Sequence, residues 1–356
     1  MQEIRRDIQQ NMENKIPQLK IAIDTGKAFT KSCYKGTGGA IVCDKFASAM
    51  GIIPEDSIQS RNNHMFYCEA LRGYFYIEDP ELCDITPTSD NEKNGSGLST
   101  GESNHDREIA VLGICLSIMK AMKNLGIYQA NVDLAIGAPL SEYEKVITDE
   151  EGYFKSLLPV RRAIKCRYEG VVRLFTITSF GVYPETLSSF SLNKGEELGN
   201  MILVDIGGNN IQYICATNGQ INFDREKTFT SKGGVNNLAR RIRTLMIQDQ
   251  IEPVGSIVEI NGWLSDPKTI PTGYGSTWKQ RFKDLIESEK KCYFKEISSI
   301  LDPVRGNYRE EIQRGYRICY TGGGSVLLKN EIKAGGGKVL DNGEYANVMG
   351  FYGLFR

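Results

Sequence analysis

The stretch MILVDIGGNNIQYICATNGQI, residues 201–221, contains the motif that decides the fold. It starts as an apolar run, reaches a single acid at Asp205, passes through a Gly-Gly pair and then alternates toward Asn218-Gly219. An apolar run, a turn and a second alternating run together predict a β-hairpin. The carboxylate of Asp205 is therefore expected at the end of a buried strand, directly before a glycine turn.

The same design occurs earlier in the chain. KIAIDTGKAFTKSCY, residues 20–34, is again an apolar strand with an acid at its end, Asp24, a glycine two residues later and a return strand. The two acids are separated by about half the length of the chain. A duplicated strand–Asp–x–Gly hairpin at this spacing indicates two related halves.

This hairpin has a chemical use. Glycine lets successive backbone N–H groups point at an anion and lets the backbone approach it closely. A carboxylate beside that turn can hold a hydrated Mg²⁺ ion, which in turn binds phosphate oxygens. Two facing hairpins would hold a polyphosphate between two domains. A third glycine segment, TGGGS at 321–325, ends a strand and opens a helix, which suits contact with a phosphate or a flat base.

Composition excludes several classes of protein. With 356 residues, 40% hydrophobic and 24% charged, the chain is long enough for about two domains. A net charge of −1 argues against direct nucleic-acid binding. The apolar runs are shorter than the roughly 20 residues of a membrane span, and residues 1–19 lack the apolar core of a signal peptide. We expect a cytoplasmic protein with no membrane contact.

Cysteine and histidine placement argues against a metal or disulfide framework. The nine cysteines form no C-x-x-C pair and several lie in apolar strand or helix patterns, which predicts reduced, buried thiols. His64 and His105 have no metal-ligand spacing. The chain also lacks a Walker A motif and the Rossmann glycine fingerprint.

Helical periodicity predicts a core-facing helix over 105–126 and amphipathic helices over 235–246 and 279–297. The segment 344–355 is expected to be a final helix with small residues where another element packs closely. Residues 86–103 contain almost no apolar side chains and are expected to form a long, mobile surface loop.

In this order the motifs resemble the actin/Hsp70/sugar-kinase superfamily. The two hairpins IDTGKAFTK (23–31) and VDIGGNN (204–210) resemble its phosphate-binding loops, and YTGGGS (320–325) resembles its adenosine motif. Within the superfamily the chain is most similar to ParM-type bacterial actins, which segregate plasmids. That similarity is carried by VDLAIGAPLSEYE (132–144), VYPETLSSF (182–190) and YANVMGFYGL (345–354).

The resemblance implies an α/β chain with the actin-like fold. Two duplicated ribonuclease-H-like domains, each a five-stranded mixed sheet with flanking helices, would surround a nucleotide cleft. The implied divisions are an N-terminal extension (1–19), domain I (20–183, with a smaller subdomain at about 36–104 and the C-terminal helix 342–356 completing it), and domain II (184–341, with a smaller subdomain at about 233–300).

The resemblance also implies roles for matching positions. Asp24 and Asp205 would bind Mg²⁺ through water, and Glu185, catalytic together with Asp205, would position the attacking water. The phosphate-binding residues would be Thr25, Gly26, Lys27, Lys31, Gly207, Gly208, Asn209 and Asn210. The nucleoside-binding residues would be Gly233, Gly234, Asn237, Gly322, Gly323, Gly324 and Ser325.

The second hairpin departs from the family pattern. Asn209 and Asn210 replace the usual threonines, and Gln212 stands where a second acid is common. Amides still donate to phosphate oxygens, so binding is expected to survive, while the hydrolysis rate and the choice of nucleotide stay open.

The implied function is a filament-forming, nucleotide-dependent bacterial actin that hydrolyses ATP to ADP, with GTP as an alternative. It would bind copies of itself, and would move plasmid DNA through an adaptor protein bound to centromere DNA, without direct nucleic-acid contact. Two alternatives stay open: a small-molecule kinase of the same superfamily, which needs a base for a substrate hydroxyl, and a non-polymerising actin-like adaptor.

Overall fold

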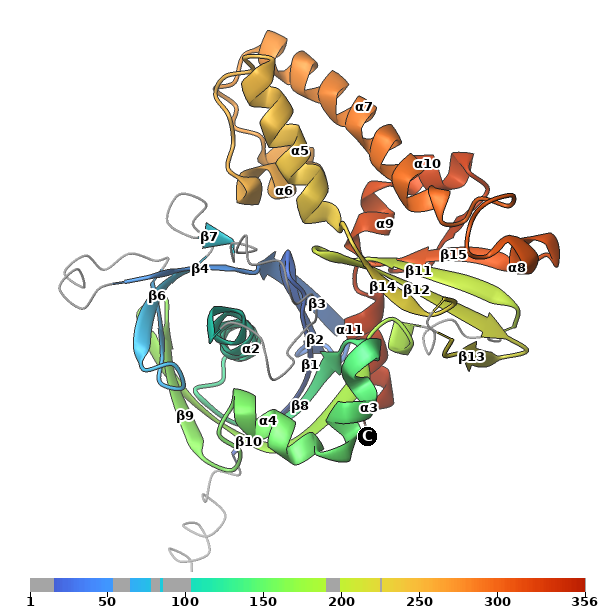
Figure 1. Ribbon diagram of the computed structural model, residues 1–356. Helices are drawn as coiled ribbons and strands as arrows, with labels where there is room; N and C mark the ends of the chain where they lie inside the picture. Colours follow the sequence, from blue (N-terminus) through green and yellow to red (C-terminus); the bar gives the residue numbers. More distant parts are fainter. Residues whose placement is uncertain are drawn as a thin grey trace, which may run out of the picture.

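Two mixed β-sheets, each containing one of the duplicated hairpins, form the framework of the described part of the computed structural model (Figure 1). The structure describes residues 16–53, 65–77, 84–85, 104–189, 199–224 and 226–355. The expected loop 86–103 and most of the expected extension 1–19 lie outside these ranges.

The first sheet is built on the first hairpin. Its order is β3-β2-β1-β8-β10-β9-β5-β6-β4-β7, with β8 parallel to both β1 and β10. The bounds are β1 (Gln18–Thr25), β2 (Phe29–Lys35), β3 (Ile41–Ala47), β4 (Ala49–Ile52), β5 (Met65–Cys68), β6 (Gly73–Ile77), β7 (Asp84–Ile85), β8 (Gln129–Ala138), β9 (Ala163–Tyr168) and β10 (Val171–Pro184).

This sheet continues beyond the five strands expected, because β10 is long enough to serve two neighbours. Its first six residues, 171–176, pair with β9, and residues 174–184 pair with β8, with a register shift between Ile177 and Ser179. Such irregularities bend a strand. The sheet curls around helix α2 (Asn104–Asn124) (Figure 1). Side chains on all faces of α2 are therefore buried, including Leu112, Ile114 and Ile118, rather than one core-facing stripe.

The second sheet repeats the hairpin design. Its order is β13-β12-β11-β15-β16, with β14 also paired to β12, and β11 is parallel to β15. The bounds are β11 (Met201–Ile206), β12 (Asn210–Thr217), β13 (Gln220–Asn222), β14 (Phe229–Lys232), β15 (Arg317–Thr321) and β16 (Lys338–Val339). Each residue of β11 is buried, which matches the apolar run in the sequence.

Helices accompany both sheets, and α5, α6 and α7 project together from the second one (Figure 1). Trp263 packs edge-on against Trp278 and Phe282, with ring centroids 5.6 and 5.3 Å apart, and so joins α6 to α7. The bounds are α3 (Leu140–Thr148), α4 (Glu150–Leu157), α5 (Val235–Gln248), α6 (Ile257–Ser265), η3 (Pro267–Thr269), α7 (Ser276–Ser299), α8 (Arg309–Gln313), α9 (Gly323–Leu327), α10 (Lys329–Ala334) and α11 (Ala346–Leu354). Within the described ranges, no helix has the length and apolar character needed to cross a membrane.

Helix α11 returns from the second sheet to the first and packs on β1, β2 and β8. Phe351 and Val348 are fully buried there, in a cluster with Ala22 and Ala135. At Gly350 a Cβ atom would lie 2.0 Å from the carbonyl oxygen of Ser188. The small residue therefore permits the close packing expected from the sequence.

The cysteines differ from the expectation in one place. Cys33 and Cys43 are direct partners across β2 and β3 and form a disulfide. The prediction that all cysteines are reduced is wrong for this pair, because it depends on strand register that the sequence spacing does not reveal. The free cysteines of the described chain are Cys68, Cys115, Cys166, Cys215 and Cys319, which are buried, and Cys292, which is exposed.

We predict that Phe351→Ala lowers the free energy of unfolding by about 3–5 kcal/mol, the usual cost of truncating a buried Phe. Leu354→Ala on the same helix is the matched control, because Leu354 is 43% exposed, and it should cost less than about 1 kcal/mol. Urea unfolding of the two variants measures the difference. Equal losses would show that the contact of α11 with the first sheet contributes little to stability.

Candidate functional site

A cavity of about 380 Å³ lies where the two hairpins meet, a volume in the range of small-ligand sites. Most of the residues expected to bind nucleotide or metal line it: Asp24, Thr25, Gly26, Lys27, Lys31, Glu185, Asp205, Gly207, Gly208, Asn209, Asn210, Gly322, Gly323 and Gly324. Gly233, Gly234, Asn237 and Ser325 are not among the lining residues. The fold thus brings together segments from across the sequence at one cavity.

The two aspartates occupy equivalent positions at the ends of β1 and β11. Asp24 is paired in register with Lys31, whose Nζ lies 3.8 Å from its Oδ2, whereas Asp205 is paired with Gln212. Both carboxylates are buried, with exposed fractions of 6% and 7%. Burial raises the pKa of Asp24, the charge of Lys31 opposes this rise, and the charge of Asp205 adds to it. The acids therefore act on each other across the cavity.

Glycines let the loops approach each other. A Cβ atom on Gly208 would lie 2.7 Å from the backbone nitrogen of Ala28 in the opposite hairpin. Gly322 has a φ of +81°, and a Cβ there would lie 2.2 Å from Oδ1 of Asp205. No other residue fits at either point without displacing a backbone or a carboxylate.

Glu185 follows the end of β10 and faces both aspartates. Its backbone N–H donates to the carbonyl oxygen of Ala138 at 2.8 Å, which fixes the start of its side chain beside β8. Burial, followed by the charges of Asp24 and Asp205, raises the pKa of Glu185 to about 8. Gln212 Nε2 donates to Glu185 Oε2 at 3.3 Å. The Gln212 amide thus orients the third carboxyl group.

Asp205 is itself held by two side chains from distant segments. The Thr186 hydroxyl donates to its Oδ2 at 2.8 Å, and Asn347 Nδ2 donates to the same oxygen at 3.0 Å. Asn347 Oδ1 in turn accepts from the backbone N–H of Thr186 at 2.9 Å. Thr186 has a φ of +63°, which is strained for a β-branched residue. Strained backbone of this kind persists where the surrounding contacts fix it.

Asn347 was missed as a site residue, although its segment was among the motifs of the resemblance. The available signal was an amide at the start of a helix otherwise made of small and apolar residues. Its role depends on α11 returning to the first sheet, which sequence periodicity does not show.

The loop of the second hairpin is fixed from behind by helix α5. The N–H groups of Val235 and Asn236 donate to the carbonyl oxygens of Gly207 and Gly208 at 3.0 and 2.7 Å. The first donors of α5 are therefore used to hold the loop. Gly234 lies directly behind it, since a Cβ there would be 2.4 Å from the carbonyl oxygen of Gly208. This contact explains the glycine directly before α5.

Side-chain amides continue this support. Asn236 Nδ2 donates to Asn209 Oδ1 at 2.7 Å, and Asn261 Nδ2 donates to Asn236 Oδ1 at 2.8 Å. Asn236 is fully buried. The chain of three amides connects the loop to α5 and α6, so Asn209 is held by the protein while it lines the cavity.

The far side of the cavity is more apolar. Leu264, Pro267, Val326 and Leu327 line it, and Lys290 from α7 adds a positive charge. Burial lowers the pKa of Lys290. An apolar wall with few polar groups suits a flat aromatic ligand. The sequence pattern gave no sign of this wall, because its members come from α6, η3 and α9.

The donor set fits a hydrated divalent cation. Asp24 and Asp205 offer buried oxygen ligands from opposite sides, and carboxylate oxygens with several waters are the arrangement that Mg²⁺ prefers. At Glu185, burial and then the charges of Asp24 and Asp205 raise the pKa, so the three carboxyl groups oppose one another's ionisation. A cation would reduce this opposition.

No protein-family model matches the sequence, and no curated protein matches it. Solved structures match over nearly the whole chain. ParM of Bacillus thuringiensis with ATP aligns with a TM-score of 0.66 at 14% identity, covering 95% of this chain and 98% of that one. A 15-stranded ParM filament from Clostridium botulinum gives 0.61 at 14%, covering 95% and 99%. The apo ParM protein of pSK41 gives 0.58 at 17%, covering 95% and 97%.

At these identities the likeness shows the fold. The chain has the actin-like fold in the form found in ParM-type bacterial actins, and the fold class expected from the sequence is confirmed.

The raised pKa of Glu185 predicts a pH effect on stability. The folded state holds this proton more tightly than the unfolded chain, in which the pKa is near 4.5. The free energy of unfolding should therefore fall as the pH rises from about 4.5 to about 8. Glu185→Gln removes this loss, so at pH ~8 the nucleotide-free variant should be more stable than wild type by about 1–2 kcal/mol, after allowing for solvent screening.

Urea unfolding at pH ~5 and ~8 measures the effect. Glu287→Gln is the control, because Glu287 lies on the exposed side of α7 and should keep the wild-type pH dependence. A Glu185→Gln variant with the same pH dependence as wild type would contradict this role for burial and the two aspartates.

Proposed function

We propose that the protein is an ATPase whose nucleotide-bound form assembles into filaments, as a bacterial actin. The observation that carries this proposal is the meeting of two Asp-Gly hairpins at one cavity, with Glu185 facing both acids. A duplicated loop of this kind binds a phosphate chain from two sides. A nucleotide bound between the two hairpins would contact both domains and so help to hold them together.

The two hairpins supply the phosphate contacts. Gly26, Gly207 and Gly208 allow close approach of the backbone, and Lys27 and Lys31 line the same cavity with positive charge. Asn210 adds an amide donor where the family has a hydroxyl. The base would lie against the apolar wall near Leu264. ATP is the proposed substrate, with GTP as the alternative.

Catalysis is assigned to Glu185, with Asp24 and Asp205 holding Mg²⁺ through water. When bound, Mg²⁺ would offset negative charge on the phosphates and on the two aspartates. Offsetting the aspartates removes part of the cause of the high pKa of Glu185. The ionised Oε atoms of Glu185 can then accept a hydrogen bond from the attacking water and orient it. Gln212 keeps the carboxylate pointed toward the cavity, and Thr186 and Asn347 keep Asp205 in place.

The proposal extends to the cellular role. The ParM-like fold and the near-neutral net charge support a cytoplasmic polymer that reaches plasmid centromere DNA through an adaptor protein. We retain the division into domain I (20–183, completed by 342–356) and domain II (184–341), because Glu185 begins the connection from the first sheet to the second. Closure of the two domains on the nucleotide would then produce the conformation of the protein that assembles into filaments.

Sedimentation with ATP, GTP, ADP or no nucleotide tests polymer formation. We expect pelleting with a triphosphate and its absence without nucleotide. Glu185→Ala should release phosphate roughly 100-fold more slowly, the usual loss when a general base is removed, and its polymer should persist longer. Glu287→Ala, an exposed change on α7, is the control and should hydrolyse at the wild-type rate.

Two results would count against the proposal. If neither triphosphate gives pelletable polymer at any ionic strength, the chain does not form nucleotide-dependent filaments. If phosphate transfer requires an added small-molecule hydroxyl acceptor, the activity is that of a kinase of the same superfamily.

A further inference from the structure

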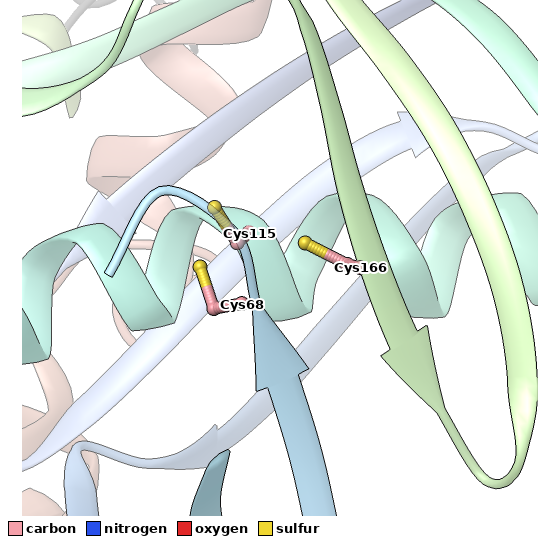
Figure 2. A group of neighbouring side chains, drawn as sticks. All are labelled: Cys68, Cys115 and Cys166. Carbon is pink, nitrogen blue, oxygen red and sulfur yellow. The ribbon is translucent and has the colours of Figure 1, made fainter. Parts of the chain in front are cut away.

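Three cysteines from separate parts of the first domain gather in its core, at a place distinct from the nucleotide cavity. Cys68 ends β5, Cys115 lies in α2 and Cys166 lies in β9. Their sulfur atoms all lie within 4.8 Å of one another, and each residue has an exposed fraction of 0%. Figure 2 shows the three side chains converging between the helix and the two strands. We call this group the thiol cluster.

The topology accounts for the convergence. Strands β5 and β9 are antiparallel neighbours, and Cys68 is the direct partner of Cys166 in their register. Helix α2 packs against both strands and places Cys115 over that pair. No short spacing in the sequence reveals the cluster, because its members are separated by about 50 positions each.

The turn after β5 directs backbone donors at the sulfur atoms. The backbone of Ala70 and Leu71 hydrogen-bonds Cys68, and that of Glu69 hydrogen-bonds Cys166. The three sulfurs thus face one another inside the core, with backbone donors beside two of them. This arrangement places three soft ligand atoms within reach of a single ion.

We propose that Cys68, Cys115 and Cys166 form a binding site for a soft, closed-shell metal ion of the Cu(I) type, coordinated by three sulfur atoms. Thiolate ligands select Cu(I), zinc and iron–sulfur clusters. Structural zinc sites almost always have four ligands, and within the described chain no histidine or carboxylate joins the three sulfurs. A buried site with three sulfurs therefore favours an ion that accepts three ligands.

The binding step is a ligand exchange without electron transfer. Cu(I) arrives from a soluble donor complex, Cu–S bonds form, and the bonds to the donor's ligands break. Each thiol that ligates as a thiolate gives its proton to solvent. The ion keeps its oxidation state, so no oxidant or reductant is consumed.

The bound ion would connect three elements. It would join the paired strands β5 and β9 of the curled sheet to α2. The same helix carries Ile109 and Ala110, which line the nucleotide cavity. The site thus lies one to two helical turns from that cavity along α2. This inference does not depend on the proposed ATPase activity, since the cluster contains none of its residues.

Anaerobic titration of the full-length protein with buffered Cu(I) tests the site, in a Cys33→Ser/Cys43→Ser/Cys292→Ser background that removes the exposed thiol and both thiols of the disulfide. We expect one ion per chain to compete with a chromogenic chelator and to give an ultraviolet thiolate-to-metal charge-transfer band. Cys68→Ser, Cys115→Ser and Cys166→Ser should each weaken binding at least tenfold. Cys319→Ser is the matched control, a buried cysteine of the second sheet, and should bind like the background protein.

Two measurements keep the test independent of how the variants fold. X-ray absorption of the Cu(I)-loaded background protein should show three sulfur neighbours, and Cu(I) should raise its unfolding temperature. Equal affinity in the cluster variants and in Cys319→Ser would overturn the proposal. Fewer than three sulfur neighbours, or a Cys68–Cys166 disulfide recovered from protein kept under reductant, would overturn it as well.

Discussion

Burying the carboxylates of Asp24 and Asp205 close to each other and to Glu185 costs free energy, because desolvation and mutual repulsion both oppose it. The upward shifts in the pKa of Asp24 and Glu185 express that cost. This cost is tolerated because the two aspartates lie at the ends of buried strands, where backbone pairing fixes their positions. Sites that store such strain are characteristically sites of chemistry. A cation between the aspartates would offset the negative charge of the carboxyl groups. A phosphate chain would then bind to that cation.

The supports of this cleft come from separate segments, and each is a neutral hydrogen-bonding group. Gln212, Thr186 and Asn347 hold the carboxyl groups without adding charge. On the loop side, Asn209 is held by a chain of amides that ends on α6. The side chains of Asn209 and Gln212 therefore have partners here. An amide in place of an acid keeps the geometry while it limits the negative charge of the cleft.

Local patterns were enough to predict both hairpins, the glycine loop before α9 and most of the helices, because each depends on residues that are neighbours in sequence. They also placed the residues that line the cavity near Asp24 and Asp205. Features that depend on strand register or on packing between distant elements could not be predicted from local sequence patterns. The Cys33–Cys43 disulfide, the thiol cluster, Lys290 and Asn347 all belong to this second kind. The curled first sheet does too, since it depends on the irregular pairing of β10.

The position of Asn347 on α11 has a consequence for the order in which the protein is made. Translation produces both hairpins and the second sheet before residue 347 is reached. A nascent chain at that stage contains all three acids but lacks the amide that connects Asp205 to the backbone of Thr186. Orientation of the Asp205 carboxylate thus coincides with docking of α11 onto the first sheet. Completion of the cavity is therefore coupled to synthesis of this late segment.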